Sequence, residues 1–355
     1  MDRVQRLRNE LASRDLEAAL ITDTLNVRYL TGFTGSFAQV VVGPTQAAII
    51  TDSRYAIQVR EECPAWDPRT FASPVRGIDF LRDTLTELGL CRVAFEADTV
   101  TYAEWQRWKE ALNGIELAPA SNLMDKLRMV KDASELDAIR QACGMTEACF
   151  EYVRPLIQVG VAEMDLALEI DFYFRRQGAV SAFDVIAVSG ERSARPHGKP
   201  SERKLQAGDF LTLDFGAKVD GYCADITRTV VVGQASDRHR NIHQAVLDAQ
   251  RSAIEAMRPG KTGHEIDQIA REALAKYDMA QFFGHGLGHG LGLLVHDFGR
   301  LGQKSETVLE PNMVLTVEPG VYIEGFGGCR IEDDVLITET GAEKLTDAGT
   351  QLLVL

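Results

Sequence analysis

The apolar residues in the first third of the chain follow two alternating spacings. Apolar residues three or four positions apart predict amphipathic helices over 3–15, 53–62, 77–90 and 101–112. Short apolar runs bounded by Gly, Pro, Thr or Asp predict strands at EAALIT, AQVVVG, QAAIIT and RVAFEA. Helices that alternate with strands are typical of an α/β domain. We therefore expect an α/β domain over residues 1–122.

The rest of the chain, residues 123–355, combines long helices with antiparallel strands. Helical spacing predicts helices over 134–157, 162–176, 236–258 and 263–278. Ser134 and Glu135 suit the first turn of the first of these helices. Strand patterns dominate residues 183–233 and the chain from about 308 onward, and Gly-rich turns interrupt them. We expect an α+β domain over 123–355.

Length and charge narrow the class of protein further. A chain of 355 residues exceeds the size of a usual single core, so two domains are expected. Thirty-eight Lys and Arg against 52 Asp and Glu give a net charge of −14, which argues against nucleic acid and anionic membranes as partners. No apolar run approaches the roughly 20 residues of a membrane span. The N-terminus also has no continuous apolar segment like that of a signal peptide, so we expect a cytoplasmic protein.

The six cysteines are scattered without a Cys-x-x-Cys pair. This usage is typical of reduced, mostly buried thiols, and it predicts neither a disulfide framework nor a thiolate zinc site.

Two acid pairs lie in apolar strand sequences. Asp214 and Asp225 are nearly symmetric about an Asp220-Gly221 turn, which predicts a hairpin with two facing carboxylates. Glu318 and Glu332 are symmetric about a Gly-rich turn further along the chain. Like charges that face each other destabilise a strand pair, and buried carboxylates without partners are costly. A cation bound between them is therefore the interpretation we favour over solvated surface acids.

A glycine-rich segment, FGHGLGHGLGLLVHDFGR, lies between these pairs and contains His285, His289 and His296. Four acids and one histidine suit two divalent first-row ions, and two such ions form a hydrolytic centre. His197 lies in a Pro- and Gly-rich loop, where functional side chains concentrate. The remaining histidines, His239, His243 and His264, are predicted to lie on polar helix faces.

The motifs DFGAKVDGYCADITRT, HGLGHGLGLLVHD, VEPGVYI and RIEDD resemble those of the pita-bread metallopeptidases, in particular the Xaa-Pro branch of aminopeptidase P and prolidase. The first domain is similar to the creatinase-type N-terminal domain of that branch. The resemblance implies an α/β creatinase-like N-terminal domain followed by an α+β pita-bread domain. It also implies metal-dependent hydrolysis of the Xaa-Pro bond at peptide N-termini, with a metal-bridging hydroxide as the nucleophile.

The resemblance implies five ligands for two divalent ions, Mn²⁺, Co²⁺ or Zn²⁺. Asp214 would bind one ion alone, Asp225 and Glu332 would bridge both ions, and His289 and Glu318 would complete the other.

The same resemblance implies further roles around the metals. Glu318 would shuttle a proton, and His296 would steady the tetrahedral oxyanion. His197 and His285 would line the proline pocket. Tyr322 and Arg330 match supporting positions around the substrate, and Arg330 could orient Asp214.

Several alternatives stay open at this point. Creatinase and the histone-chaperone relatives lack the metal ligands, so a non-catalytic peptide-binding module is disfavoured. Methionine aminopeptidases usually lack the N-terminal domain found here. Arg300, four residues after His296, could bind the carboxylate of a dipeptide and so favour a strict Xaa-Pro dipeptidase. Asp297 resembles the aminopeptidase P pattern, and the link between Glu318 and Glu332 is too short for an inserted lid. Both favour an Xaa-Pro aminopeptidase that also cuts dipeptides, which is the activity we predict from the sequence.

The resemblance also implies a homodimer. Tyr29, Phe33 and Phe37 are aromatic residues of the first domain that could serve an interface or the core equally well.

Overall fold

The computed structural model describes residues 2–355. The chain forms two compact units, the first ending at Arg128 and the second beginning at Met129. Among the described residues, no helix combines the length and apolar character that crossing a membrane requires. Each unit has a core of its own.

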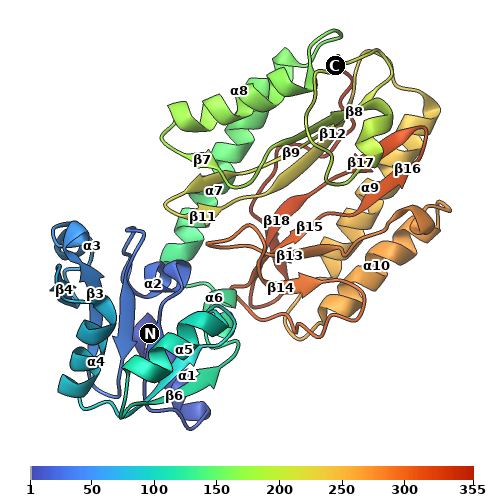
Figure 1. Ribbon diagram of the computed structural model, residues 1–355. Coiled ribbons are helices and arrows are strands. Elements are labelled where there is room, and N and C mark those ends of the chain that lie inside the picture. Colours follow the sequence, from blue (N-terminus) through green and yellow to red (C-terminus); the bar gives the residue numbers. More distant parts are fainter. Residues whose placement is uncertain (1) are drawn as a thin grey trace. The chain divides into compact units, whose positions relative to one another are not determined.

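The first unit, coloured blue to teal in Figure 1, contains a six-stranded sheet in the order β4-β3-β2-β1-β5-β6. The strands are β1 (Ala19–Ile21), β2 (Gln39–Val42), β3 (Ala47–Asp52), β4 (Asp67–Phe71), β5 (Arg92–Glu96) and β6 (Glu116–Ala120). The β1–β2 and β2–β3 pairs are antiparallel, whereas β1–β5, β3–β4 and β5–β6 are parallel. The mixture of helices and a partly parallel sheet confirms the predicted α/β class.

Five helices accompany this sheet: α1 (Arg3–Ser13), α2 (Thr24–Thr31), α3 (Gln58–Glu62), α4 (Gly77–Glu87) and α5 (Tyr102–Ala111). Apolar spacing did not predict α2, because polar side chains occupy part of its buried face. Asn26 is one of them, and its amide donates to the Glu96 carboxylate over 2.6 Å. Tyr29 and Phe33 are core residues of the unit, both about 1% exposed. A short helix, α6 (Asp125–Met129), ends at the start of the second unit.

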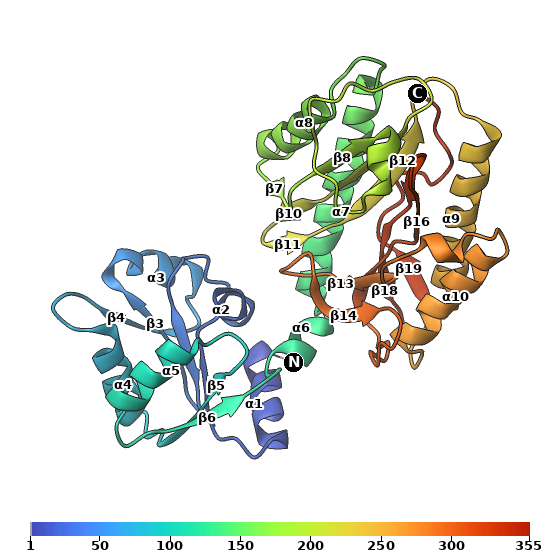
Figure 2. The same ribbon diagram turned by 45° about the vertical axis from the view of Figure 1, so that its right-hand side comes forward.

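In the second unit, strands lie between the helix pair α7–α8 and the helix pair α9–α10 (Figures 1 and 2). The helices are α7 (Ala133–Val153), α8 (Glu163–Arg176), α9 (Asp237–Ala256) and α10 (Gly263–Ala275). Helix α7 begins one residue before the predicted Ser134, because Asp132 is its N-cap and forms a capping box with Glu135. One apolar cluster packs α7 and α8 against their strands, and a second packs α9 and α10 against theirs.

The strands of the second unit form four small sheets. The first half contains β7 (Val180–Ser181), β8 (Ile186–Ser189), β9 (Phe210–Phe215), β10 (Ala217–Val219), β11 (Tyr222–Cys223) and β12 (Ile226–Val231). The second half contains β13 (Gly288–Gly290), β14 (Asp297–Leu301), β15 (Val314–Val317), β16 (Gly320–Ile323), β17 (Gly327–Arg330), β18 (Asp333–Ile337) and β19 (Ala342–Lys344). The β12-β9-β8 and β14-β13-β15-β18-β19 sheets are antiparallel, which confirms the α+β class.

Strand register determines which acids approach each other. In the β16–β17 hairpin, Gly320 pairs with Arg330, and this register continued outward sets Glu318 opposite Glu332 as predicted. In the β9–β12 pair, Asp214 lies opposite Thr227, so Asp225 is displaced diagonally and does not face Asp214 directly. At Gly216, between β9 and β10, the backbones approach so closely that a Cβ atom would lie 1.7 Å from the Ala224 carbonyl oxygen.

The six cysteines are free thiols, and five of them are buried. The exception is Cys91, which is exposed. The prediction of mostly buried, reduced cysteines is therefore confirmed.

The prediction of polar helix faces is wrong for two histidines. His239 and His243 are 6% and 4% exposed, because both lie on the core-facing side of α9. The His239 ring packs edge-on against Phe210, with 4.6 Å between ring centroids, and its Nδ1 lies 2.8 Å from the Ser236 hydroxyl. His264 is exposed as predicted.

Burial of His243 predicts a pH-dependent stability. Burial, and then the positive charge of Arg228, lower the pKa of His243 to about 4. In the unfolded chain His243 takes up a proton near pH 6.5, whereas in the folded chain it stays neutral down to about pH 4. The free energy of unfolding therefore falls as the pH drops from 6.5 toward 4. The expected loss is about 3 kcal/mol.

Denaturant unfolding of the metal-free protein at pH 7.5 and at pH 4 measures this loss, with His243→Gln as the comparison because glutamine does not titrate. The free energy of unfolding of the wild type should fall by that amount more than that of the variant. Equal losses of unfolding free energy in the two proteins would contradict a lowered pKa of His243.

Candidate metal centre

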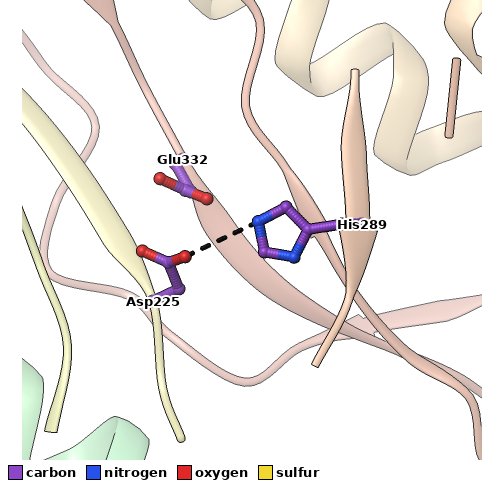
Figure 3. Close-up of side chains that lie close together, drawn as sticks. All are labelled: Asp225, His289 and Glu332. Carbon is purple, nitrogen blue, oxygen red and sulfur yellow. Dashed lines mark ion pairs between the residues drawn. The ribbon is translucent and has the colours of Figure 1, made fainter. Parts of the chain in front are cut away.

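Three of the predicted ligands converge in the second unit. Candidate ligand atoms of Asp225, His289 and Glu332 all lie within 4.8 Å of one another, and the three side chains point toward a common centre (Figure 3). Asp225 directly precedes β12, His289 is the central residue of β13, and Glu332 lies between β17 and β18. Three segments that are distant in sequence, each on or next to a strand, therefore bring these groups together.

The other two predicted ligands lie at the edge of this group. The His289 Nε2 atom is 3.7 Å from a Glu318 oxygen and 3.7 Å from an Asp225 oxygen. Asp214, on β9, shares the same cleft and accepts a hydrogen bond from Arg330 Nη2. Arg330 therefore holds the orientation of Asp214, which is the contact that the sequence suggested.

The donor set fits a cation. Asp214 Oδ1, Asp225 Oδ1 and Glu332 Oε1 are buried and accept no hydrogen bond from any of residues 2–355. Buried polar atoms are rarely left without partners. Carboxylate oxygens beside one imidazole nitrogen form a set that divalent first-row ions accept.

The His289 ring supports the same interpretation. Its Nδ1 lies 3.1 Å from the Gly290 carbonyl oxygen, which can only accept, so Nδ1 carries the proton. Burial lowers the pKa of His289 to about 4, so the ring is neutral near pH 7. In the ionised form that would bind a cation, the carboxylates of Asp225 and Glu318 beside the Nε2 lone pair also only accept. A positive ion between these atoms resolves that repulsion.

The acids of this group are strongly perturbed. Burial raises the pKa of Asp225 and of Glu332 well above their ordinary values, and the neighbouring carboxylates raise them further. Burial also raises the pKa of Glu318 to about 8. Perturbed titratable groups in a cleft are typical of functional sites.

Residues that sequence reasoning did not single out form hydrogen bonds with the candidate ligands. Thr227 donates its hydroxyl to Glu332 over 2.6 Å, and Asp334 accepts the backbone N–H of Asp225 over 2.9 Å. Arg228 donates to the Glu332 carbonyl and forms a buried ion pair with Asp333 over 2.6 Å. The run of three acids at 332–334 was the available signal, but spacing alone does not tell a ligand from its support.

The acid group lies in a cleft of about 820 Å³. His197, His285, His296 and Arg300, all predicted as site residues, line this cleft. Sequence reasoning missed one wall, which α8 forms with residues such as Met164 and Leu168 at helical spacing. In the sequence alone, apolar residues at this spacing predict an ordinary core-facing helix.

Tyr322 and His285 form a hydrogen-bonded pair beside the acids. His285 Nδ1 lies 2.8 Å from the Gly286 carbonyl oxygen, so this nitrogen is the donor and Nε2 accepts from the Tyr322 hydroxyl over 2.9 Å. Arg330 donates to the same hydroxyl oxygen over 2.7 Å. Burial lowers the pKa of His285 to about 4, which keeps the ring neutral.

His296 and Arg300 are both neighbours of His289. The rings of His289 and His296 meet edge to face with 4.3 Å between centroids. Arg300 is the cross-strand partner of His289 in the β13–β14 pair, and directly opposed residues project from the same face of a sheet. An exposed cation therefore accompanies the imidazoles at this wall of the cleft.

Comparison with known proteins defines the class. The model of metallopeptidase family M24 matches residues 137–339, and that of the creatinase/prolidase N-terminal domain matches residues 3–130. The chain belongs to the M24 metallopeptidases and is an enzyme of that class, with a creatinase-type first domain and a pita-bread second domain. Membership of this family implies divalent metal ions.

Relatives resemble the chain over nearly its full length. It is 35% identical to an Xaa-Pro dipeptidase of Pyrococcus furiosus, covering 99% of each chain. The solved Xaa-Pro dipeptidase of Bacillus anthracis is 40% identical, with a TM-score of 0.96 over 100% of this chain and 99% of that one. The solved X-Pro aminopeptidase of Thermotoga maritima is 35% identical, with a TM-score of 0.93 over 100% of both chains.

Proposed function

We propose that Asp214, Asp225, His289, Glu318 and Glu332 hold two divalent ions, Mn²⁺, Co²⁺ or Zn²⁺. The convergence of Asp225, His289 and Glu332 supports this assignment, as do the unpartnered carboxylate oxygens. Ions bound there would supply Lewis acidity and lower the pKa of a water molecule, so that it becomes a nucleophile at neutral pH.

The chain's own groups would manage protons and orientation around that water. Glu318, at the edge of the acid group and partly accessible, can accept a proton from the attacking water and return it to the leaving nitrogen. His296 faces the cleft and can donate an N–H to the oxyanion of the tetrahedral intermediate. His197 and His285 would border the ring of the substrate proline.

We propose further that the enzyme hydrolyses Xaa-Pro peptides and prefers dipeptides, which places it as an Xaa-Pro dipeptidase. The observation that carries the dipeptide preference is the placement of Arg300 beside His289 and His296. In an Xaa-Pro dipeptide the proline bears the terminal carboxylate, and an arginine can bind it through two parallel hydrogen bonds. The names of the Pyrococcus and Bacillus relatives support the same preference.

An Xaa-Pro aminopeptidase, which the sequence favoured, is the second candidate. Asp297 and the short chain between Glu318 and Glu332 support it, as does the name of the Thermotoga neighbour. The balance of named relatives nevertheless favours the dipeptidase.

Steady-state kinetics on matched substrates tests both parts of the proposal. We expect kcat/KM to be highest for an Xaa-Pro dipeptide, lower for the corresponding Xaa-Pro-Yaa tripeptide, and far lower for Xaa-Ala. The nitrogen of a prolyl peptide bond has no N–H and belongs to a ring. A pocket shaped for that ring can therefore select proline. Equal values for Xaa-Pro and Xaa-Ala would contradict proline specificity. Faster cleavage of the tripeptide would favour the aminopeptidase.

We also propose a homodimer, as the family resemblance implied, and a cytoplasmic location, as the sequence suggested. Light scattering at micromolar concentration should give about twice the mass of one chain. A monomer under these conditions would contradict the dimer.

A further inference from the structure

His285 lies in a segment that has little structure of its own. Residues 283–287 belong to no helix or strand, and Gly284 and Gly286 on either side of His285 are both exposed. Glycine loses more conformational freedom on ordering than any other residue. Contacts from outside the segment must therefore determine where the His285 ring points.

The Tyr322 hydroxyl contacts the ring itself, and helix α10 holds the backbone of the segment through one arginine. Arg271 Nη1 donates to the Phe283 carbonyl over 2.9 Å, and Nη2 donates to the His285 carbonyl over 2.6 Å. The guanidinium carbon also lies 4.4 Å from the centre of the Phe283 ring. The planar guanidinium thus holds the backbone at His285 itself and at the residue two positions before it.

A buried acid orients the arginine and reaches the end of the same segment. Asp267 is completely buried and accepts from Arg271 Nε over 2.7 Å and from Nη2 over 3.2 Å. The same carboxylate accepts the backbone N–H of Leu287 over 3.2 Å. The Leu287 carbonyl in turn accepts the N–H of Glu318 over 2.8 Å, so the segment adjoins a proposed ligand.

We propose that Asp267 and Arg271 form a positioning clamp that aims His285 into the cleft. The clamp consists of a carboxylate and a guanidinium that bind three backbone groups of residues 283–287, and neither residue lines the cleft. The ring of Phe283, held under Arg271, packs edge-on against His285 with 4.9 Å between centroids. The catalytic consequence rests on the proposed function, because there His285 borders the substrate proline.

Amide hydrogen exchange of the metal-free protein tests the clamp without relying on activity. In Arg271→Met, amides in a peptide covering residues 283–288 should exchange about ten- to a hundredfold faster than in the wild type, because charged hydrogen bonds to the segment are lost. Lys261→Met is the matched control, since it removes an ion pair of the same i,i+4 spacing from the N-terminal end of α10. The control should leave exchange at 283–288 unchanged.

Two further variants separate positioning from stability. Arg271→Lys keeps the charge pairing with Asp267, but one ammonium cannot reproduce the planar fork that reaches both carbonyls. The double variant Asp267→Asn/Arg271→Met leaves no unpaired buried charge and should recover most of the melting temperature lost in Arg271→Met. Both variants should still show fast exchange at 283–288.

Kinetics with metal-loaded enzyme completes the test. All three Arg271 variants should lose about 100-fold in kcat/KM on an Xaa-Pro dipeptide, since misplacing a group by about 1 Å costs this much. Lys261→Met should retain wild-type activity. If Arg271→Lys or the double variant regained wild-type kcat/KM, or if exchange at 283–288 were unchanged in Arg271→Met, the clamp would be excluded. A wild type inactive on Xaa-Pro would overturn the proposed function and leave the exchange result standing.

Discussion

Asp225→Asn should abolish nearly all peptidase activity and markedly reduce metal loading. Asp225 is one of the three converging candidate ligands, and an amide cannot bind cations as a carboxylate does. Lewis-acid stabilisation by bound metal contributes several kcal/mol to catalysis, so we expect a loss of about three decades in kcat/KM. Elemental analysis after reconstitution should approach two ions per chain for the wild type and markedly fewer for the variant.

The same substitution should have the opposite effect on the metal-free protein. Asp225 has a buried oxygen without a hydrogen-bond partner, and burial and neighbouring acids raise the pKa of its carboxyl well above normal. Removing this ionisable group should raise the free energy of unfolding of the metal-free protein by roughly 1–3 kcal/mol at pH 8. Divalent metal should then raise the melting temperature of the wild type much more than that of the variant.

Asp220→Asn is the matched control for this experiment. Asp220 is an exposed turn residue with a φ of 48°, a conformation that asparagine adopts readily, and the chemical change is identical. The control should bind metal and cleave substrate like the wild type. Full activity of Asp225→Asn would contradict the proposed metal centre.

Arg300→Ala should discriminate between dipeptide and longer substrates. If Arg300 binds the proline carboxylate, kcat/KM should fall by about one to two decades on Xaa-Pro and much less on Xaa-Pro-Yaa. The range follows from the roughly 1.5–3 kcal/mol that a hydrogen bond to a charged group contributes. A higher KM for Xaa-Pro with little change in kcat would show that Arg300 binds the substrate equally well in the ground state and in the transition state.

A surface arginine offers the control for that measurement. Arg258 lies on the exposed surface just after α9, outside the cleft, and its replacement by alanine should leave both substrates unaffected. Equal losses on the two substrates in Arg300→Ala would show that Arg300 supports structure. The dipeptide preference would then lack the residue on which we base it.

Much of the candidate site was predictable because it lies in dense local motifs. Glu318 and Glu332 are symmetric about one Gly-rich turn, so local register alone set them opposite each other. The first acid pair was predicted less well, because the β9–β12 register places Thr227 opposite Asp214. The hairpin closes at Asp220-Gly221 as expected, with Val219 opposite Tyr222, but the two aspartates are not equally far from that turn and therefore lie diagonally across it.

The sequence by itself determined the fold class, the free thiols and the composition of the acid and histidine motifs, because apolar periodicity and local turn chemistry encode them. Only the tertiary structure decided what surrounds those motifs. It buried His243 within a helix pattern that looked polar, and it placed Asp334 behind Asp225 and Arg271 behind His285. These are contacts between residues roughly 14 to more than 100 positions apart, and they arise only when separate strands and helices pack together. The physical reason is that local sequence sets the conformation of each segment, whereas packing decides which buried charge meets which partner.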